Sequence, residues 1–334
     1  MSDVAVAHVG SPRVTAYPWS GGFGAKYTDP ATLPTGNGHG IAFSPNGNDI
    51  AVAHDATPFI TAYPWNSGFG AKYTDPATLP VGSGRSVAFS PNGNDIAVGH
   101  NTTPFITAYP WNAGFGAKYT NPGTLPNSFG RGVAFAPNGA DIVVAHGSTP
   151  FVTAYPWNSG FGTKYTNPAT LPPSQGTSVA FSPSGNDVAV GHFDSPFVTV
   201  YPWSSGFGVK YTNPATLPSL NGIGVSFSPS GADIAIAHVT SPFVTTYPWS
   251  SGFGAKYTDP ATLPTGTGVS VAFSPNGNDI AVGHSVTPFV TAYPWNSGFG
   301  AKYTDPSTLP SGEGRGVAFR NSLNPAIAHR RLLL

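Results

Sequence analysis

The sequence predicts an all-β fold, a seven-bladed β-propeller with four antiparallel strands per blade and a last blade closed by both termini. Tryptophan recurs at a constant step of 46 residues, the interval from Trp19 to Trp65, at positions 19, 65, 111, 157, 203, 249 and 295. Histidine and lysine repeat in the same register, starting at His8 and Lys26. No segment carries helical periodicity. Short apolar segments in units of this length are typical of propeller blades.

Each repeat contains four segments that are predicted to be strands. In the unit that contains Trp65, these segments span residues 41–44, 49–54, 59–63 and 71–74. Asn46-Gly47 is a strong signal for a hairpin turn between the first two. In the second strand, large Ile50 and Val52 alternate with small residues, which suits a sheet buried on both faces.

The two ends of the chain are expected to complete one blade. Residues 3–8 match the second strand of the other repeats, and residues 317–319 match the first strand. Such closure leaves no exposed sheet edge between the blades. We therefore expect the propeller to occupy residues 1–320 and residues 321–334 to form an irregular tail outside the seventh blade. Residues 326–329 also resemble a second strand, but residues 3–8 already fill that place.

The composition argues against several classes of partner. Charged residues make up 8% of the chain and the net charge is zero, so no general binding of nucleic acid is expected. Cysteine is absent, which rules out disulfides. We expect no membrane span, because no apolar run is long enough. The first residues, MSDVAVAHVG, do not resemble a signal peptide. The location is left open between the cytoplasm and a virus particle.

The segment FSPNGNDIAVGH at residues 89–100 resembles WD-repeat propellers and related bacterial repeats that share a Ser-Pro-Asp/Asn-Gly turn. The resemblance covers residues 1 to about 320. Tyr-Pro-Trp followed by Asn or Ser occupies the place of the family's Trp-Asp dipeptide, as in Trp65-Asn66. The even repeats look more like those of bacterial or bacteriophage propellers. The resemblance implies that the first strand of each blade lines a central channel.

No residue pattern indicates catalysis, a metal site or a cofactor. One histidine per blade puts the seven too far apart to share a metal ion, since zinc needs three or four converging ligands. Each histidine is expected to end the second strand with a local hydrogen bond. Asp49 recurs in every complete repeat, whereas a catalytic group is needed once, so a role at a turn or strand end is expected. On these grounds we expect that the protein is not an enzyme.

The repeats differ from one another at two connections, the one before the first strand and the one after the histidine. Both are expected on the same face of the ring. Free drift of solvent loops and blade-specific contacts are alternative explanations. The position before the first strand is occupied by His39, Arg85, Arg131, Thr177, Ile223, Val269 and Arg315. Its four basic residues come from consecutive blades and are expected to form an arc at the channel mouth.

These observations predict a non-catalytic binding or scaffold protein, such as a structural or attachment component. It would engage a protein or anionic partner through the variable loop face, with His39, Arg85, Arg131 and Arg315 as binding residues. The alternative is a multivalent carbohydrate-binding lectin. Most repeated aromatic residues are expected in the core, but rings beside glycine at the turns would stack on sugars if exposed. The residues of this alternative site are Trp65, Phe69, Trp111 and Phe115.

Overall fold

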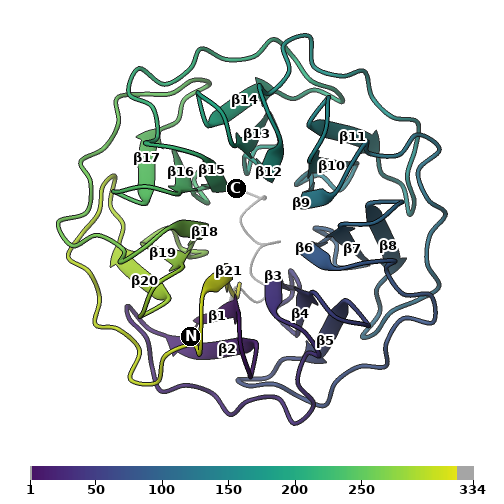
Figure 1. Cartoon of the computed structure of the whole chain (residues 1–334), viewed down its shortest axis with the longest axis horizontal. Coiled ribbons are helices and arrows are strands. Elements are labelled where there is room, and N and C mark those ends of the chain that lie inside the picture. The colour runs from purple at the N-terminus through teal and green to yellow at the C-terminus, as the bar shows by residue number, and fades with distance from the viewer. Residues whose placement is uncertain (1, 322–334) are drawn as a thin grey trace, which may run out of the picture.

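The computed structural model, which describes residues 2–321, is a ring of seven small antiparallel sheets (Figure 1). The inner strands of the sheets line a central cavity, which we call the channel. Within these residues all regular structure is β-strand, and no helix is long and apolar enough to cross a membrane. The prediction of an all-β, seven-bladed propeller is confirmed.

The strands are β1 (Ser2–His8), β2 (Val14–Trp19), β3 (Gly38–Phe43), β4 (Asp49–His54), β5 (Ile60–Pro64), β6 (Gly84–Phe89), β7 (Asp95–His100), β8 (Ile106–Pro110), β9 (Gly130–Phe135), β10 (Asp141–His146), β11 (Val152–Pro156), β12 (Gly176–Phe181), β13 (Asp187–His192), β14 (Val198–Pro202), β15 (Gly222–Phe227), β16 (Asp233–His238), β17 (Val244–Pro248), β18 (Gly268–Phe273), β19 (Asp279–His284), β20 (Val290–Pro294) and β21 (Gly314–Phe319).

Both ends of the chain build one blade, as the sequence predicts. Its sheet has the order β2-β1-β21, so that an N-terminal strand lies between its neighbour in sequence and the last strand of the chain. Val4 is opposite Tyr17 on one side and opposite Phe319 on the other. The other six sheets each use three consecutive strands, with the first beside the channel (Figure 1). The expectation for the tail at 321–334 falls outside the described residues from 322 onward.

Each blade has three regular strands instead of the predicted four. The chain after β5 turns back and runs beside it, joined by isolated backbone hydrogen bonds. Gly70 N–H donates to the Pro64 carbonyl at 2.8 Å, and Tyr73 N–H donates to the Ala62 carbonyl at 2.9 Å. A continuous ladder does not form, because Pro64 has no N–H to donate. The outer segment at residues 71–74 is therefore extended chain rather than a strand.

Neighbouring blades pack by fitting large side chains against small ones. Ile50 and Val52 on one face of β4 belong to a buried cluster with Ala5 and Ala7 of β1. The small side chains on the other face of β4 pack in the same way against the large ones of β7. The alternation of large and small residues along the middle strand thus sets the spacing of the blades. Packing of this kind buries both faces of each middle strand, as the sequence predicts.

A buried carboxylate links each blade to the next. Asp49 accepts a hydrogen bond from the Tyr73 hydroxyl at 2.7 Å and one from Trp111 Nε1 at 3.2 Å. Trp111 belongs to the following blade, and the edge of the Tyr73 ring meets its indole at 5.3 Å between ring centroids. The same carboxylate–tyrosine–tryptophan group recurs around the ring, and the link that closes the ring is the hydrogen bond from Trp19 Nε1 to Asp279 at 2.9 Å. Asp49 therefore does more than the turn or strand-end role that the sequence suggests.

The histidine at the end of each middle strand is buried and hydrogen-bonded. His54 Nε2 lies 2.9 Å from Thr61 Oγ1 of the adjacent strand, and His54 has no exposed surface. Burial lowers the pKa of His54 to about 4, so its ring is neutral at neutral pH. The expected local hydrogen bond is confirmed. Among residues 2–321, no three histidine, aspartate or glutamate side chains gather to hold a metal ion.

Candidate functional site at the mouth of the central channel

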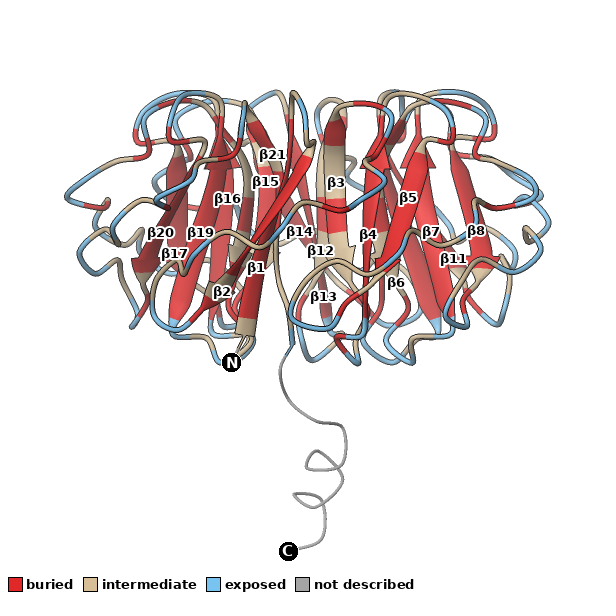
Figure 2. Cartoon of the chain, turned by 90° about the horizontal axis from the view of Figure 1, so that it is seen from below, coloured by how far each residue is buried: buried red, intermediate tan, exposed pale blue. Residues whose placement is uncertain are grey.

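The two variable connections of each blade meet on one face of the ring, as expected. Gly38 at the start of β3 pairs with His54 at the end of β4, which brings the loops before and after these strands together. Asn37 N–H donates to Asp55 Oδ1 at 2.7 Å between the two loops. In the side view of the ring, connections cover the two faces while the strands run between them (Figure 2). The opposite face carries the Ser-Pro-Asn-Gly turns.

A backbone irregularity in every inner strand directs one side chain toward the channel. In β3, Gly38 pairs with His54 and Gly40 pairs with Ala53, so His39 is an extra residue opposite no partner. This is a β-bulge, which leaves one residue outside the ladder and re-aims its side chain. The residues at the bulge are His39, Arg85, Arg131, Thr177, Ile223, Val269 and Arg315. They are the positions that differ between blades, and they line one cavity of about 460 Å³.

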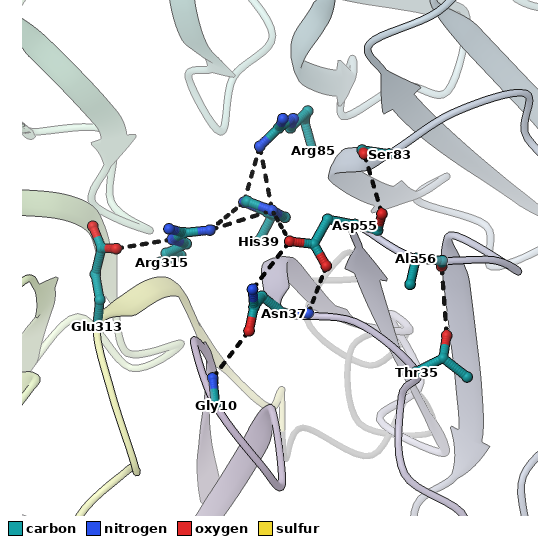
Figure 3. A network of polar contacts seen from close by, with 10 residues as sticks. All are labelled: Gly10, Thr35, Asn37, His39, Asp55, Ala56, Ser83, Arg85, Glu313 and Arg315. Atoms are coloured by element: carbon teal, nitrogen blue, oxygen red, sulfur yellow. Dashed lines mark hydrogen bonds and ion pairs between the residues drawn. The ribbon is translucent and has the colours of Figure 1, made fainter.

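His39 lies between two guanidinium groups (Figure 3). Arg85 Nη1 is 3.4 and 3.2 Å from His39 Nδ1 and Nε2, and Arg315 Nη1 is 3.2 and 3.3 Å from the same two atoms. A donor aimed at a lone pair in the ring plane lies close to one nitrogen only. These nearly equal distances therefore place Arg85 Nη1 and Arg315 Nη1 over the face of the imidazole rather than in its plane. The carboxylate of Asp55 lies on the Nε2 side of the ring, with Oδ2 at 3.6 Å from His39 Nε2.

The charges around His39 keep its ring neutral. The pKa of His39 is lowered to about 4 by burial and by the charges of Arg85 and Arg315. Asp55 acts in the opposite direction, with Oδ2 at 3.6 Å from His39 Nε2. Glu313 accepts a hydrogen bond from Arg315 Nε at 3.0 Å and offsets part of the positive charge. The neutral imidazole of His39, whose side chain is 10% exposed, thus lies at the channel mouth between two cations.

Arg131 extends the basic arc by one blade. Its Nη2 donates to Gln175 Oε1 at 2.8 Å, and its guanidinium carbon lies 5.3 Å from the centre of the Phe193 ring, within cation–π range. Burial and the charge of Arg85 lower the pKa of Arg131. The structure therefore brings together all four residues that the sequence selects, as one arc: Arg315, His39, Arg85 and Arg131.

Some residues of the site were not selected from the sequence. Gln175 and Phe193 enter through Arg131, and Asp55 enters through His39. Phe193 carries a signal that was available, since it is the aromatic residue at a position where the other blades have small, aliphatic or polar residues. Gln175 carries no such signal, because its contact joins two blades through side chains 44 positions apart.

The repeated aromatic residues form no sugar-binding surface. Trp65 is 2% exposed and Trp111 is 4% exposed, with both indole nitrogens committed to aspartates. Phe69 packs its ring against Trp65, with centroids 4.9 Å apart and the planes nearly perpendicular, and Phe115 packs against Trp111 in the same way. Stacking on a sugar needs an open indole face, which neither tryptophan has. The lectin alternative is wrong for this reason, whereas the expectation of a mainly core role is confirmed.

Solved structures with a similar fold include proteins that are named as lactonases. No family model and no curated protein matches the chain. A periplasmic gluconolactonase of Pseudomonas aeruginosa has a similar structure, with a TM-score of 0.72 and 14% identity over 96% of this chain and 99% of that chain. Proteins of Bacteroides fragilis and Bacteroides uniformis, described as candidate 6-phosphogluconolactonases, give TM-scores of 0.71 and 0.70 at 13% identity. They cover 96% and 95% of this chain, and 98% and 99% of their own.

These neighbours correct two expectations from the sequence. They are named as lactonases, which are hydrolases, and this contradicts the expectation of a non-catalytic binding or scaffold protein that is not an enzyme. They are also lactonase-like rather than WD-repeat or bacteriophage propellers. At 13–14% identity the likeness shows the fold alone. The expectation of a non-catalytic protein was based on residues that recur in every blade, such as Asp49 and His54. Their recurrence argues against a catalytic role for them, but it does not bear on residues that occur in one blade only.

Proposed function

We propose that the chain is a hydrolase that opens a lactone bearing an anionic group, at the mouth of the central channel. The observation that carries this proposal is the arc of three arginines around the neutral imidazole of His39. The lactonase names of the structural neighbours suggest the reaction, and the arc suggests the charge of the substrate. The binding residues are those selected from the sequence: His39, Arg85, Arg131 and Arg315.

The arginines have spare capacity for an anion. Among residues 2–321, neither Arg85 nor Arg131 is hydrogen-bonded to a carboxylate. Burial and the neighbouring Arg315 lower the pKa of Arg85, so an added negative charge would relieve unfavourable interactions. Guanidinium groups bind carboxylate and phosphate in bidentate geometry. A cavity of about 460 Å³ is in the range of small-molecule sites.

The imidazole and the guanidinium groups suit the chemistry of lactone opening. Water attacks the carbonyl carbon, a proton passes from the water to His39, and the carbonyl oxygen becomes negatively charged. A guanidinium stabilises that charge in the tetrahedral intermediate. The C–O bond of the ring then breaks, and His39 returns the proton to the leaving oxygen. Bound substrate anion neutralises part of the field of Arg85 and Arg315, which raises the pKa of His39 from about 4 and makes it a stronger base.

A pH-stat assay tests the proposal. Proton release from 6-phosphoglucono-1,5-lactone and from glucono-1,5-lactone is measured with enzyme and compared with the spontaneous rate. Of these two lactones, we expect the phosphorylated one to be accelerated more, because only it carries an anionic group for the arginines. Arg85→Ser should raise KM roughly tenfold or more for the phosphorylated lactone, as expected for losing a charge-assisted contact. His39→Gln should lower kcat by about 100-fold with a smaller effect on KM.

The matched control is the variant Lys118→Ser, Lys164→Ser, Lys210→Ser. It removes the same number of positive charges as replacement of all three arginines, but from the outer segments, where each lysine bonds an asparagine of its own blade. Its kinetics should equal those of the parent. Hydrolysis of both lactones at the spontaneous rate, by a protein that is folded, would overturn the proposal.

A further inference from the structure

The channel mouth has two chemically different halves. Four consecutive blades supply the basic arc, and the other three supply the bulge residues Thr177, Ile223 and Val269. We call these three residues the neutral arc. Phe193 lies at the border, where the Arg131 guanidinium covers its ring at 5.3 Å. We infer that the site binds an amphipathic anion, with its charged group on the arginines and an aliphatic or aromatic group on the neutral arc.

The neutral arc offers little to a polar ligand. Ile223 and Val269 have no side-chain hydrogen-bonding groups. The Thr177 hydroxyl already donates to the Gly222 carbonyl at 2.6 Å. A sugar hydroxyl placed against this arc would lose hydrogen bonds to water without gaining equivalent ones, which costs free energy. An apolar group would lose nothing of this kind and would gain from burial.

The division of the mouth is a property of individual residues rather than of the repeat. All seven bulges interrupt the strand pairing at the same place, and all seven bulge residues line the same cavity. Phe193 strengthens the apolar half, since it is the aromatic residue at its position and lines the cavity. A ligand that spans the mouth from Arg85 to Val269 therefore meets cations at one end and aliphatic carbon at the other.

This inference rests on the proposed function for the identity of the site, but it is tested by binding rather than by turnover. Isothermal titration calorimetry is performed with inorganic phosphate and with ethyl, butyl, hexyl and octyl phosphate. Burying a methylene fully is worth about fourfold in affinity, and we expect about threefold per methylene in this partly open site. Hexyl β-glucoside, which is neutral, should bind much more weakly than hexyl phosphate.

Two variants separate the halves. Ile223→Ser with Val269→Ser should flatten the dependence on chain length and leave the affinity for inorganic phosphate unchanged. Arg85→Ser should weaken every phosphate by a similar factor. Val209→Ser is the matched control, because Val209 is 83% exposed on an outer segment and should retain the full chain-length dependence.

The outcomes distinguish this inference from the proposed function. Equal affinity for ethyl and octyl phosphate would overturn the amphipathic ligand, even if 6-phosphoglucono-1,5-lactone is hydrolysed. A steep dependence on chain length that the double variant removes would support it, even if neither lactone is hydrolysed. The same steep dependence in the double variant would also overturn it, since the apolar group would then bind elsewhere.

Discussion

The two faces of the ring differ in which residues of the repeat are constant and which vary between blades. On the face of the Ser-Pro-Asn-Gly turns, every blade has the same buried aspartate, tyrosine and tryptophan, and these groups hold neighbouring blades together. On the variable loop face, every blade has a bulge at the same place, but the side chain in it varies around the ring. The bulge residue lies outside the hydrogen-bonded ladder, so it is free to change without loss of pairing. Closure of the ring and recognition of a ligand are therefore carried by different residues.

The largest effect is expected from opening the ring. Deletion of residues 1–8 removes β1, which pairs with both β2 and β21, and it removes Asp3, which bonds Tyr27 and Trp65. The remaining blades would expose two unpaired sheet edges and a buried face. We expect loss of cooperative unfolding, or a melting temperature lower by tens of degrees, in circular dichroism. A deletion variant that melts at the parent temperature would show that the N-terminal strand does not close the ring.

Acid is the next strongest test, because it acts on every blade at once. Burial lowers the pKa of every strand-end histidine in the folded protein, to about 4 at His54 and His146, against about 6.5 in an unfolded chain. The folded state therefore binds fewer protons between these pH values, and stability falls as pH drops from about 6.5 toward 4. By pH 5 the loss is on the order of 1–2 kcal/mol per histidine.

This acid effect is measured as the melting temperature between pH 7.5 and 5, above the range in which ordinary carboxylates titrate. We expect a steep fall over this interval. The variant His146→Gln keeps a group that can bond Thr153 but cannot be protonated, so its melting temperature should fall less steeply than that of the parent. A flat profile in the parent would mean that these histidines are not buried in neutral form.

A moderate effect is expected from removing one carboxylate between blades. Asp49→Ala leaves the Tyr73 hydroxyl and Trp111 Nε1 without their acceptor in a buried place. Unsatisfied buried donors cost about 1–3 kcal/mol each, so a loss of about 2–4 kcal/mol is expected in the free energy of unfolding by urea. Asp75→Asn is the control, since the Asp75 side chain is 41% exposed and should change stability by less than about 0.5 kcal/mol. Equal losses in both variants would refute the structural role of Asp49.

The sequence predicts the ring better than it predicts the site. Identical spacing of the repeats suffices for seven blades and for closure by residues 3–8 and 317–319, because equivalent residues must occupy equivalent places. The start of the inner strand was predicted at Ile41 and is found at Gly38, since a segment rich in glycine has low strand propensity. The sequence therefore predicts His39 in the loop before the strand, whereas the structure places it at a bulge inside β3.

Contacts between blades account for the other differences. Trp111 and Asp49 are 62 positions apart, and no local pattern joins a tryptophan to the carboxylate of the preceding blade. The prediction of a fourth strand was wrong for a local reason. Pro64 in β5 has no N–H group, so β5 cannot offer the outer segment a continuous row of donors. The expectation that the protein is not an enzyme was wrong for a different reason. Recurrence in every blade argues against a catalytic role for Asp49 and His54, but it carries no information about a residue that occurs in one blade only, such as His39.

The smallest effect on stability is expected from the residues that matter most to the proposed function. The triple arginine variant combines Arg85→Ser, Arg131→Ser and Arg315→Ser. It removes three half-buried cations together with the repulsion between them. The three substitutions also remove the hydrogen bonds to Glu313 and Gln175, which are partly exposed and contribute little. Burial and neighbouring arginines lower the pKa of both Arg85 and Arg131, which means that their positive charges destabilise the folded state to some extent. The free energy of unfolding should change by less than about 1 kcal/mol, in either direction.

Salt sharpens this last test. In the parent, repulsion within the arc is screened as ionic strength rises, so the melting temperature should increase with added sodium chloride. The triple arginine variant should lack this part of the salt dependence, whereas Lys118→Ser, Lys164→Ser, Lys210→Ser should retain it, because its lysines lie in separate outer segments. Sulfate should stabilise the parent more than chloride at equal ionic strength, since an anion bound between the guanidinium groups stabilises the folded state by mass action. A triple arginine variant that is several kcal/mol less stable than the parent would mean that the arc holds the ring together, and the separation of closure from recognition would be lost.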